Sequence, residues 1–176
     1  MCLTKQSIRA SRAGTGGFRP PEVLLKYQQQ DQKIDIWAAG VCLIILLSRR
    51  YHSREKISNF SLKTMFLRYP YFPAVEDSLA LVHIASLLGK SSIMEVAVSL
   101  GKRLNFAGIP DPVHSLAETV HLQRKNSSRG VSSPSETTSP EWRHVIDLLQ
   151  SLLNPDPKKR PDASEALQMD FFLLYS

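Results

Sequence analysis

One segment of this 176-residue chain constrains its fold more than any other: the run from Ile34 to Ser48, IDIWAAGVCLIILLS. It predicts a helix whose apolar side chains cover nearly the whole circumference. Such a helix has no water-facing side and must be buried among other elements. Its uncharged part, Ile36 to Leu47, is too short for a membrane span, which needs about 20 residues. The run therefore predicts a buried helix inside a globular core.

Capping and stop signals predict further helices on both sides of this run. They cover residues 22–28, 77–88, 92–101, 139–153 and 162–170. Two of them open with capping-box patterns, Ser92-x-x-Glu95 and Asp162-x-x-Glu165, and a third opens with Ser139-Pro140. Gly89 and Gly101 are the stop signals, and Phe171 and Phe172 follow the last helix. Because no stretch shows convincing strand alternation, the sequence predicts a mainly α fold.

The segments between these helices have loop composition. Residues 1–20 are polar and basic, and residues 49–76 are predicted to be an irregular connection. Residues 123–139 combine Ser, Thr, Lys, Arg and Pro with almost no apolar side chain, which predicts a flexible Ser-rich insert. Within it, Ser133-Pro134 and Ser139-Pro140 are candidate phosphorylation sites for proline-directed kinases.

Composition limits the function classes. The net charge of +6 comes entirely from residues 1–60, with ten Lys/Arg against four Asp/Glu. Aromatic side chains for base stacking are not interleaved with these cations, which makes direct nucleic-acid binding the weakest reading. Cys2 and Cys42 predict neither a disulfide framework nor a zinc site, and the five histidines lack metal-ligand spacing. No metal site, signal peptide or membrane segment is predicted, and the expectation is a soluble intracellular protein.

The first of three informative motifs is GTGGFRPPE at residues 14–22. Its glycines and prolines are typical of a tight loop that leads into a helix. Read alone, the segment is equally well explained as an ordinary turn before a helix.

The second motif is Asp35-x-Trp37-x-x-Gly40, which opens the buried helix. Asp35 suits a helix start, where the helix dipole favours a negative charge. That simpler reading does not account for Trp37 or Gly40.

The third motif is DLLQSLLNPDPKKRP at residues 147–161, followed by Ala163, Glu165 and Ala166. Lys158 and Lys159 are explained by a solvated basic turn. A buried role suits Arg160 better, because its guanidinium has five fixed donors that match a carboxylate.

In this order, the three motifs resemble the C-terminal helical lobe of a eukaryotic Ser/Thr protein kinase, an incomplete part of that α+β fold. The resemblance makes residues 1–22 the end of an activation segment and residues 23–176 the helices of the lobe. It assigns substrate binding to the loop residues Thr15, Gly16, Gly17 and Phe18. It gives structural roles to Asp35, which accepts hydrogen bonds from the catalytic loop, to Trp37, to Gly40, which permits close packing, and to a buried ion pair between Glu22 and Arg160.

A narrower resemblance is to the cell-division-cycle-seven kinases. It rests on Arg12-Ala13-Gly14-Thr15 followed by Gly17-Phe18-Arg19-x-Pro21-Glu22-Val23-Leu24, on Ile34-Asp35-x-Trp37-x-Ala39-Gly40-Val41 and on Leu46-Leu47-Ser48. It implies protein substrates, in particular the minichromosome maintenance helicase, an activating subunit of the Dbf type, and a nuclear location.

Two kinds of departure from this family stand out. The family usually has Pro at position 16 and Ala at position 20, where this chain has Gly16 and Pro20. Residues 51–68 separate two halves of what resembles a single S-G-R-Y-P-F motif, and a retained intron or gene-model error is our hypothesis for this insert.

The residues that bind ATP and magnesium in kinases do not occur in this sequence. It has no G-x-G-x-x-G cover, since position 19 is Arg, and no catalytic-loop H-R-D or D-F-G segment. ATP and magnesium are therefore implied for the full-length family only. We expect no catalytic residue and no activity in this chain alone. The alternative function is a catalytically dead interaction module that competes for the activating subunit or the substrates.

The same comparison predicts that part of the Ile34–Ser48 helix lacks its cover. We expect an apolar face including Trp37, Val41, Ile44, Ile45 and Leu47 to be exposed, which would leave the chain loosely packed and prone to association.

Overall fold

The computed structural model describes residues 13–48, 71–73, 76–106, 108, 111–127 and 139–175. These ranges contain eight helices and no strand, so the predicted mainly α class is confirmed for them. The insert at residues 51–68 and the candidate phosphorylation site Ser133 lie outside the described residues. None of the helices in these ranges is long and apolar enough to cross a membrane.

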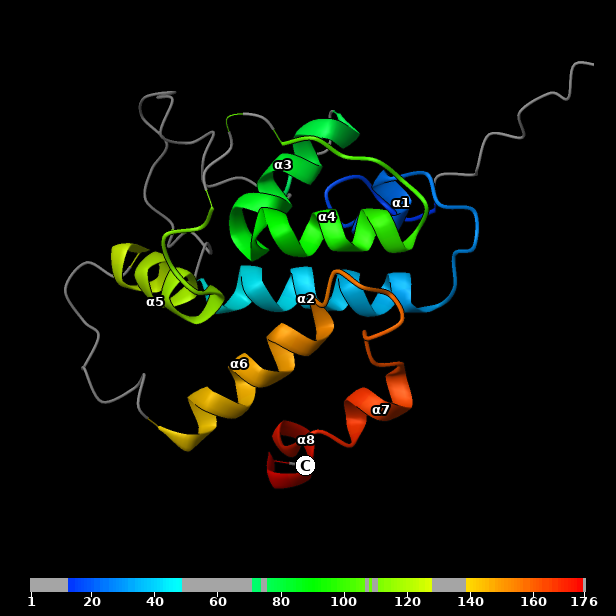
Figure 1. Ribbon diagram of the computed structural model, residues 1–176. Coiled ribbons are helices and arrows are strands. Elements are labelled where there is room, and N and C mark those ends of the chain that lie inside the picture. The colour runs from blue at the N-terminus through cyan, green and yellow to red at the C-terminus, as the bar shows by residue number, and fades with distance from the viewer. Residues whose placement is uncertain are drawn as a thin grey trace, which may run out of the picture.

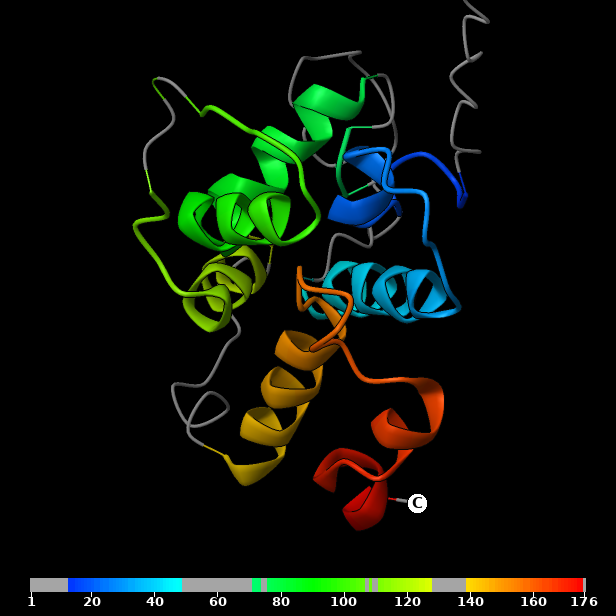
Figure 2. The same ribbon diagram turned by 45° about the vertical axis from the view of Figure 1, so that its right-hand side comes forward.

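Helix α2 runs through the middle of the molecule, and the other helices lie on two sides of it (Figure 1). On one side lie α1 (Pro21–Leu24), α3 (Asp77–Leu88) and α4 (Lys90–Ser99); on the other lie α6 (Pro140–Leu152), α7 (Ala163–Leu167) and α8 (Asp170–Tyr175). The α2 helix itself is Lys33–Leu47, and α5 (Leu116–Ser127) lies beside its carboxyl end. The turned view preserves this order (Figure 2).

The core forms around α2. Trp37, Val41 and Ile44 are completely buried and belong to the main cluster, to which α3, α4, α5 and α6 also contribute. A smaller cluster of Leu148, Leu152 and Ala166 lies between α6, α7 and α8. The long apolar run is therefore the central element of the core, as its composition predicts.

The predicted bare face of α2 is wrong in its residues. Trp37, Val41 and Ile44 are buried, and Ile45 and Leu47 are partly buried. The side that faces outward carries Asp35, Ala39, Cys42 and Leu46, which follow helical spacing and which we call the exposed stripe. Composition alone does not identify this stripe, because its alanine, cysteine and leucine are as apolar as their buried neighbours.

Helix α3 begins and ends where the sequence predicts. It ends at Gly89, whose φ of 97° lies in the region that glycine adopts most easily. Helix α4 differs from the prediction because it begins at Lys90, with Gly89 as its N-cap and no capping side chain. Ser92 therefore lies inside α4, and the predicted start there is wrong: the turn at Gly89 restarts the helix immediately.

Helix α5 was not among the predicted helices. Its start has a reciprocal cap, in which the Ser115 backbone N–H donates to Glu118 Oε2 (2.8 Å) and the Glu118 N–H donates to Ser115 Oγ (3.2 Å). The helix extends to Ser127, so the flexible insert predicted to begin at Gln123 does not include residues 123–127. The Ser-x-x-Glu pattern was the signal that would have found it.

The carboxyl-terminal helices follow their caps. Ser139 Oγ accepts a hydrogen bond from the Trp142 N–H at 3.2 Å, as predicted for the start of α6. Asp162 and Glu165 form the predicted capping box of α7. Phe171 and Phe172 do not follow the last helix, however, because they lie within α8 and pack against the smaller cluster.

The first predicted helix, residues 22–28, is shorter than expected. Helix α1 ends at Leu24, and Lys26 then adopts a φ of 55°, which a continuing right-handed helix does not allow.

Candidate functional site

The loop before α1 is a tight turn held by its own backbone. Gly14 and Gly17 have positive φ angles of 76° and 84°, and the Phe18 N–H donates to the Thr15 carbonyl at 3.1 Å. Thr15 is exposed, Gly16 is half-buried, and Gly17 and Phe18 are buried. Of the four predicted substrate-binding residues, Phe18 therefore has its side chain mainly in the core.

Arg19 fixes this turn to the rest of the molecule. Its Nε donates to the Gly14 carbonyl at 3.1 Å, which closes the loop on itself. Its Nη1 lies 3.7 Å from Asp77 Oδ1 at the start of α3. No sequence pattern indicates this pair, because Arg19 and Asp77 are far apart in the chain.

A hollow of about 260 Å³ lies between the turn and α2. We call it the loop hollow, and it is lined by Gly14, Thr15, Phe18, Ile34, Asp35 and Ala38. Thr15 brings a hydroxyl and Asp35 a carboxylate to a wall that is otherwise apolar or backbone. Both groups can accept backbone N–H donors from a polypeptide segment.

Asp35 also begins the exposed stripe, so the loop hollow opens onto that side of α2. The stripe continues along the helix through Ala39 and Cys42 to Leu46, whose side chain is 69% exposed. The loop hollow and the stripe together form a surface with polar acceptors at one end and apolar side chains at the other. This surface can hold a segment of extended or looped chain.

The base of the site is a buried ion pair between Glu22 of α1 and Arg160. Arg160 Nη1 lies 2.7 Å from Glu22 Oε1, and Nη2 lies 3.0 Å from Oε2, a bidentate arrangement. The side chains are 0% and 2% exposed. The contact is the one implied by the sequence motifs, between residues 138 positions apart.

Arg160 also bonds to two other parts of the chain. Its Nη1 donates to the Lys33 carbonyl at the start of α2, and its Nε donates to the Asn154 carbonyl after α6, both at 3.0 Å. The guanidinium lies 5.2 Å from the centre of the Trp37 ring. One side chain thus joins α1, α2 and the turn after α6.

Trp37 and Gly40 occupy the inner side of α2. Trp37 is completely buried and stacks with Phe72 at 6.4 Å between ring centres. A Cβ atom at Gly40 would lie 2.9 Å from Leu153 Cδ2 and 3.0 Å from Leu152 Cβ. Gly40 therefore allows α2 and α6 to pack as closely as the motif implies.

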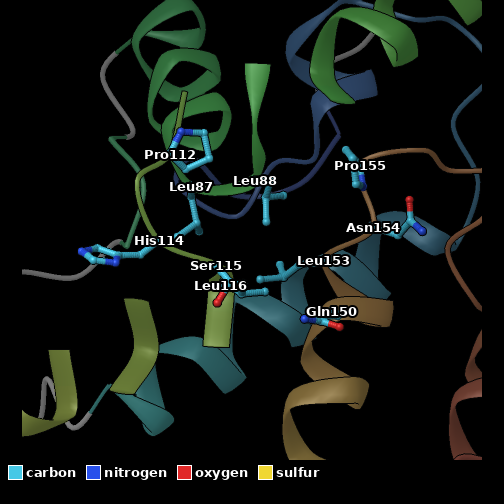
Figure 3. A pocket seen from close by; sticks show the side chains of 10 residues that line it. All are labelled: Leu87, Leu88, Pro112, His114, Ser115, Leu116, Gln150, Leu153, Asn154 and Pro155. Atoms are coloured by element: carbon cyan, nitrogen blue, oxygen red, sulfur yellow. The ribbon is translucent and has the colours of Figure 1, made fainter. Parts of the chain in front are cut away.

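A second depression lies away from the loop hollow, between α3, α5 and the end of α6 (Figure 3). We call it the side groove; its volume is about 230 Å³. Leu88, Leu116 and Leu153 approach it from three elements, and Gln150 and Asn154 provide polar groups on one wall. Its lining carries no Asp, Glu, Lys or Arg.

Chemical groups for metal binding are not gathered in the described part of the chain, which holds no cluster of three His, Cys, Asp or Glu side chains suited to an ion. What the site provides is a rigid anchor and a surface for polypeptide. Glu118 and Glu141 have pKa values below the ordinary value. The cause for Glu118 is hydrogen bonding from the Ser115 backbone and hydroxyl, and for Glu141 bonding from its own backbone N–H and from Ser139. Both lie at helix starts outside the loop hollow.

Comparison with known proteins identifies what this arrangement resembles. A model of the protein kinase domain matches residues 2–172. The chain is 34% identical over 165 residues to a probable serine/threonine-protein kinase cdc7 of Dictyostelium discoideum, covering 94% of this chain and 13% of that protein. In Schizosaccharomyces pombe, it is 34% identical to the cell cycle protein kinase spo4 (93% and 34% covered) and 33% identical to the cell cycle serine/threonine-protein kinase hsk1 (97% and 31% covered). The chain thus spans about a third or less of the length of these relatives.

Proposed function

This chain belongs to the protein kinase family and is Cdc7-like, and we propose that it serves as the substrate-facing helical lobe of a Ser/Thr protein kinase. The observation that carries the proposal is the buried pair of Glu22 and Arg160. It ties the end of the first motif to the third, and so holds the loop before α1 at a fixed place beside α2. Positioning of this kind is most of what a protein contributes to phosphoryl transfer.

Within this proposal, residues 1–22 are the end of the activation segment, and the turn from Thr15 to Phe18 receives the protein substrate. The position of Thr15 and Phe18 on the wall of the loop hollow supports this role. The catalytic loop of a whole kinase would rest on the exposed stripe, where the Asp35 carboxylate can accept its backbone N–H donors. ATP and magnesium would be held by that loop and by the other lobe, since this sequence lacks the motifs for them.

The partners and the location follow from the family resemblance. We propose protein substrates of the replication machinery, with the minichromosome maintenance helicase first among them, an activating subunit of the Dbf type, and a nuclear site of action. The relatives include two cell cycle kinases, spo4 and hsk1, which supports the cell-cycle part of this proposal.

A chimera tests the function directly. The segment of hsk1 that corresponds to this chain is replaced by residues 1–176, and transfer of labelled phosphate from ATP to a protein substrate is measured with the activating subunit present. We expect the chimera to phosphorylate the substrate, whereas residues 1–176 alone transfer no phosphate.

Matched variants make this test specific. Arg160→Gln should abolish transfer by the chimera, because it removes the anchor of the loop. Lys159→Gln, an exposed neighbour, should leave transfer unchanged. A chimera that melts cooperatively and binds the activating subunit, yet phosphorylates nothing, would contradict the proposed function.

The runner-up function is a catalytically dead interaction module, favoured by the missing ATP-binding motifs. In that case residues 1–176 would bind the activating subunit on their own and reduce the activity of the intact kinase. Co-precipitation of the purified chain with that subunit tests the binding, and no detectable binding would remove this second function. Adding the chain in excess to the intact kinase tests the inhibition, which a lobe that acts only within a whole kinase would not cause.

A further inference from the structure

Ser139 combines a sequence signal with an unusual structural position. It is followed by Pro140, the first residue of α6, and its backbone is extended, with φ −70° and ψ 146°. Proline imposes this extended conformation on the residue before it and offers no N–H of its own. Those are the features by which a proline-directed kinase recognises its acceptor residue.

The turn that Ser139 caps can open at small cost. Pro140, Glu141 and Arg143 are exposed, and only Trp142 of this first turn is partly buried against the main core. Local opening is favoured where few apolar contacts are lost. The Ser139 hydroxyl oxygen accepts a hydrogen bond from the Trp142 N–H at 3.2 Å, the long end of the hydrogen-bond range.

We propose that Ser139 is a phosphorylation site for a proline-directed protein kinase that uses ATP. In the reaction, Ser139 Oγ bonds to the γ-phosphorus of ATP, and the bond from that phosphorus to the β–γ bridging oxygen breaks. ADP leaves, and the hydroxyl proton passes to the catalytic base of the modifying kinase.

Two arginines lie on the helices next to Ser139. Arg143 follows Ser139 by one turn of α6, and its backbone N–H donates to the Ser139 carbonyl at 3.3 Å. Arg124, on α5, lies with its guanidinium carbon 5.4 Å from the centre of the Trp142 ring. A phosphoserine paired with Arg124 would connect α5 to α6, the two helices that flank residues 128–138.

One group opposes the phosphate. The Ser139 hydroxyl bonds to the Glu141 carboxylate, and that contact becomes a repulsion when the oxygen is phosphorylated. Glu141 is exposed and can turn toward water, which weakens this repulsion. We expect the start of α6 to be more firmly fixed in the phosphorylated form, through the Trp142 N–H and an arginine that turns toward the phosphate.

The first experiment maps the modification. Residues 1–176 are incubated with a purified cyclin-dependent kinase and ATP, and phosphate is located by mass spectrometry. We expect phosphate on Ser139, none at that position in Ser139→Ala, and at least a tenfold lower rate at Ser139 in Pro140→Ala, which keeps the acceptor. Phosphate confined to Ser133, or a rate in Pro140→Ala equal to that of the unaltered chain, would overturn the proposal.

The second experiment measures the consequence. Hydrogen exchange at the Trp142 and Arg143 amides should slow several-fold on phosphorylation in low salt. In Arg124→Gln, phosphate should still be added but the slowing should largely disappear, while Lys158→Gln, an exposed cation elsewhere, should behave as the unaltered chain. Faster exchange after phosphorylation, equal in all three proteins, would show that the arginine contact does not form.

Discussion

The side chain of Arg160 joins α1, the start of α2 and the turn after α6. Its side chain donates four hydrogen bonds, two to Glu22 and one each to the carbonyls of Lys33 and Asn154, with 0% exposure. Arg160→Ala would leave the Glu22 carboxylate buried without its partner. We expect the free energy of unfolding to fall by about 3 to 5 kcal/mol, measured by denaturant titration.

Two further variants separate charge from geometry. Arg160→Lys keeps the charge but cannot make the bidentate contact. Its free energy of unfolding should therefore lie between those of the unaltered chain and Arg160→Ala. Lys159→Ala, on the exposed neighbour, should change stability by less than about 0.5 kcal/mol. Equal stability of the Lys159 and Arg160 variants would show that the buried pair contributes nothing.

Gly40 makes a different kind of contribution, through the absence of a side chain. In Gly40→Ala the new methyl group meets Leu152 and Leu153 at about 3.0 Å or less. Overpacking costs about 1 to 3 kcal/mol, which exceeds the gain of roughly 1 kcal/mol in helix propensity. We therefore expect a lower melting temperature for Gly40→Ala. At the neighbouring exposed position, Ala39→Gly measures the effect of helix propensity alone.

The sequence predicted some of these contacts and missed others for a physical reason. The pair of Glu22 and Arg160 was predicted because both residues lie in motifs that resemble those of protein kinases. The contact of Arg19 with Asp77 was not found, since a partly exposed ion pair imposes no pattern on the neighbouring residues. Arg160 also donates hydrogen bonds to the backbone carbonyls of Lys33 and Asn154. Every residue has such a carbonyl, so no residue type in the sequence indicates these two bonds.

Turning to the helices, α5 depends on a cap that responds to pH. The Ser115 N–H and hydroxyl both donate to Glu118 Oε2, which holds the pKa of Glu118 below its ordinary value. A lowered folded-state pKa means that the carboxylate stabilises the helix start above the unfolded-state pKa near 4.5, and that this stabilisation is lost as pH falls through the folded-state pKa. An NMR titration should show the Ser115 amide and the Glu118 carboxyl changing together below that ordinary value.

Glu118→Gln provides the control for this prediction. Its side chain can still accept from Ser115 but does not ionise in this range, so the Ser115 amide should lose its acid transition. A transition that persists unchanged in Glu118→Gln would assign it to a different group.

Helix boundaries were predictable where a residue or residue pair has one main structural role, such as ending or capping a helix. Gly89 and the capping pair of Asp162 and Glu165 fix the end of α3 and the start of α7 as expected. The start of α4 was misplaced because a glycine can end one helix and cap the next, so Ser92 had no capping role. Residues 123–127 are helical despite their polar composition, since Gln123 bonds to Tyr71 and the cap at Ser115 starts the helix that includes them.

At the scale of the whole molecule, the exposed stripe of α2 should determine how the chain behaves in solution. Leu46 is 69% exposed, whereas Ile44, two residues earlier, is completely buried. Leu46→Gln should reduce binding of a hydrophobic dye with little change in melting temperature. Ile44→Ala should instead lower the free energy of unfolding by about 2 to 5 kcal/mol.

The contrast between the two variants is the test. If Leu46→Gln leaves dye binding unchanged while Ile44→Ala raises it, the dye reports loose packing of the core rather than the stripe. The sequence predicted that one face of this helix would be bare. The residues named were wrong because, beyond Asp35, the outer side carries no polar residue that distinguishes it from the buried side. The positions of the neighbouring helices, α5 and α6 among them, decide which side remains uncovered.

The ion pair between Glu22 and Arg160 also constrains when the protein can fold. A ribosome that adds roughly 5 to 20 residues per second needs roughly 7 to 28 s to make the 138 residues that separate the partners. During that time the Glu22 carboxylate has no guanidinium to meet, and α1 cannot be fixed against α2 through Arg160. Folding of this region therefore cannot be completed before residue 160 has been made, and nascent chains that stop before it should be held by chaperones or degraded.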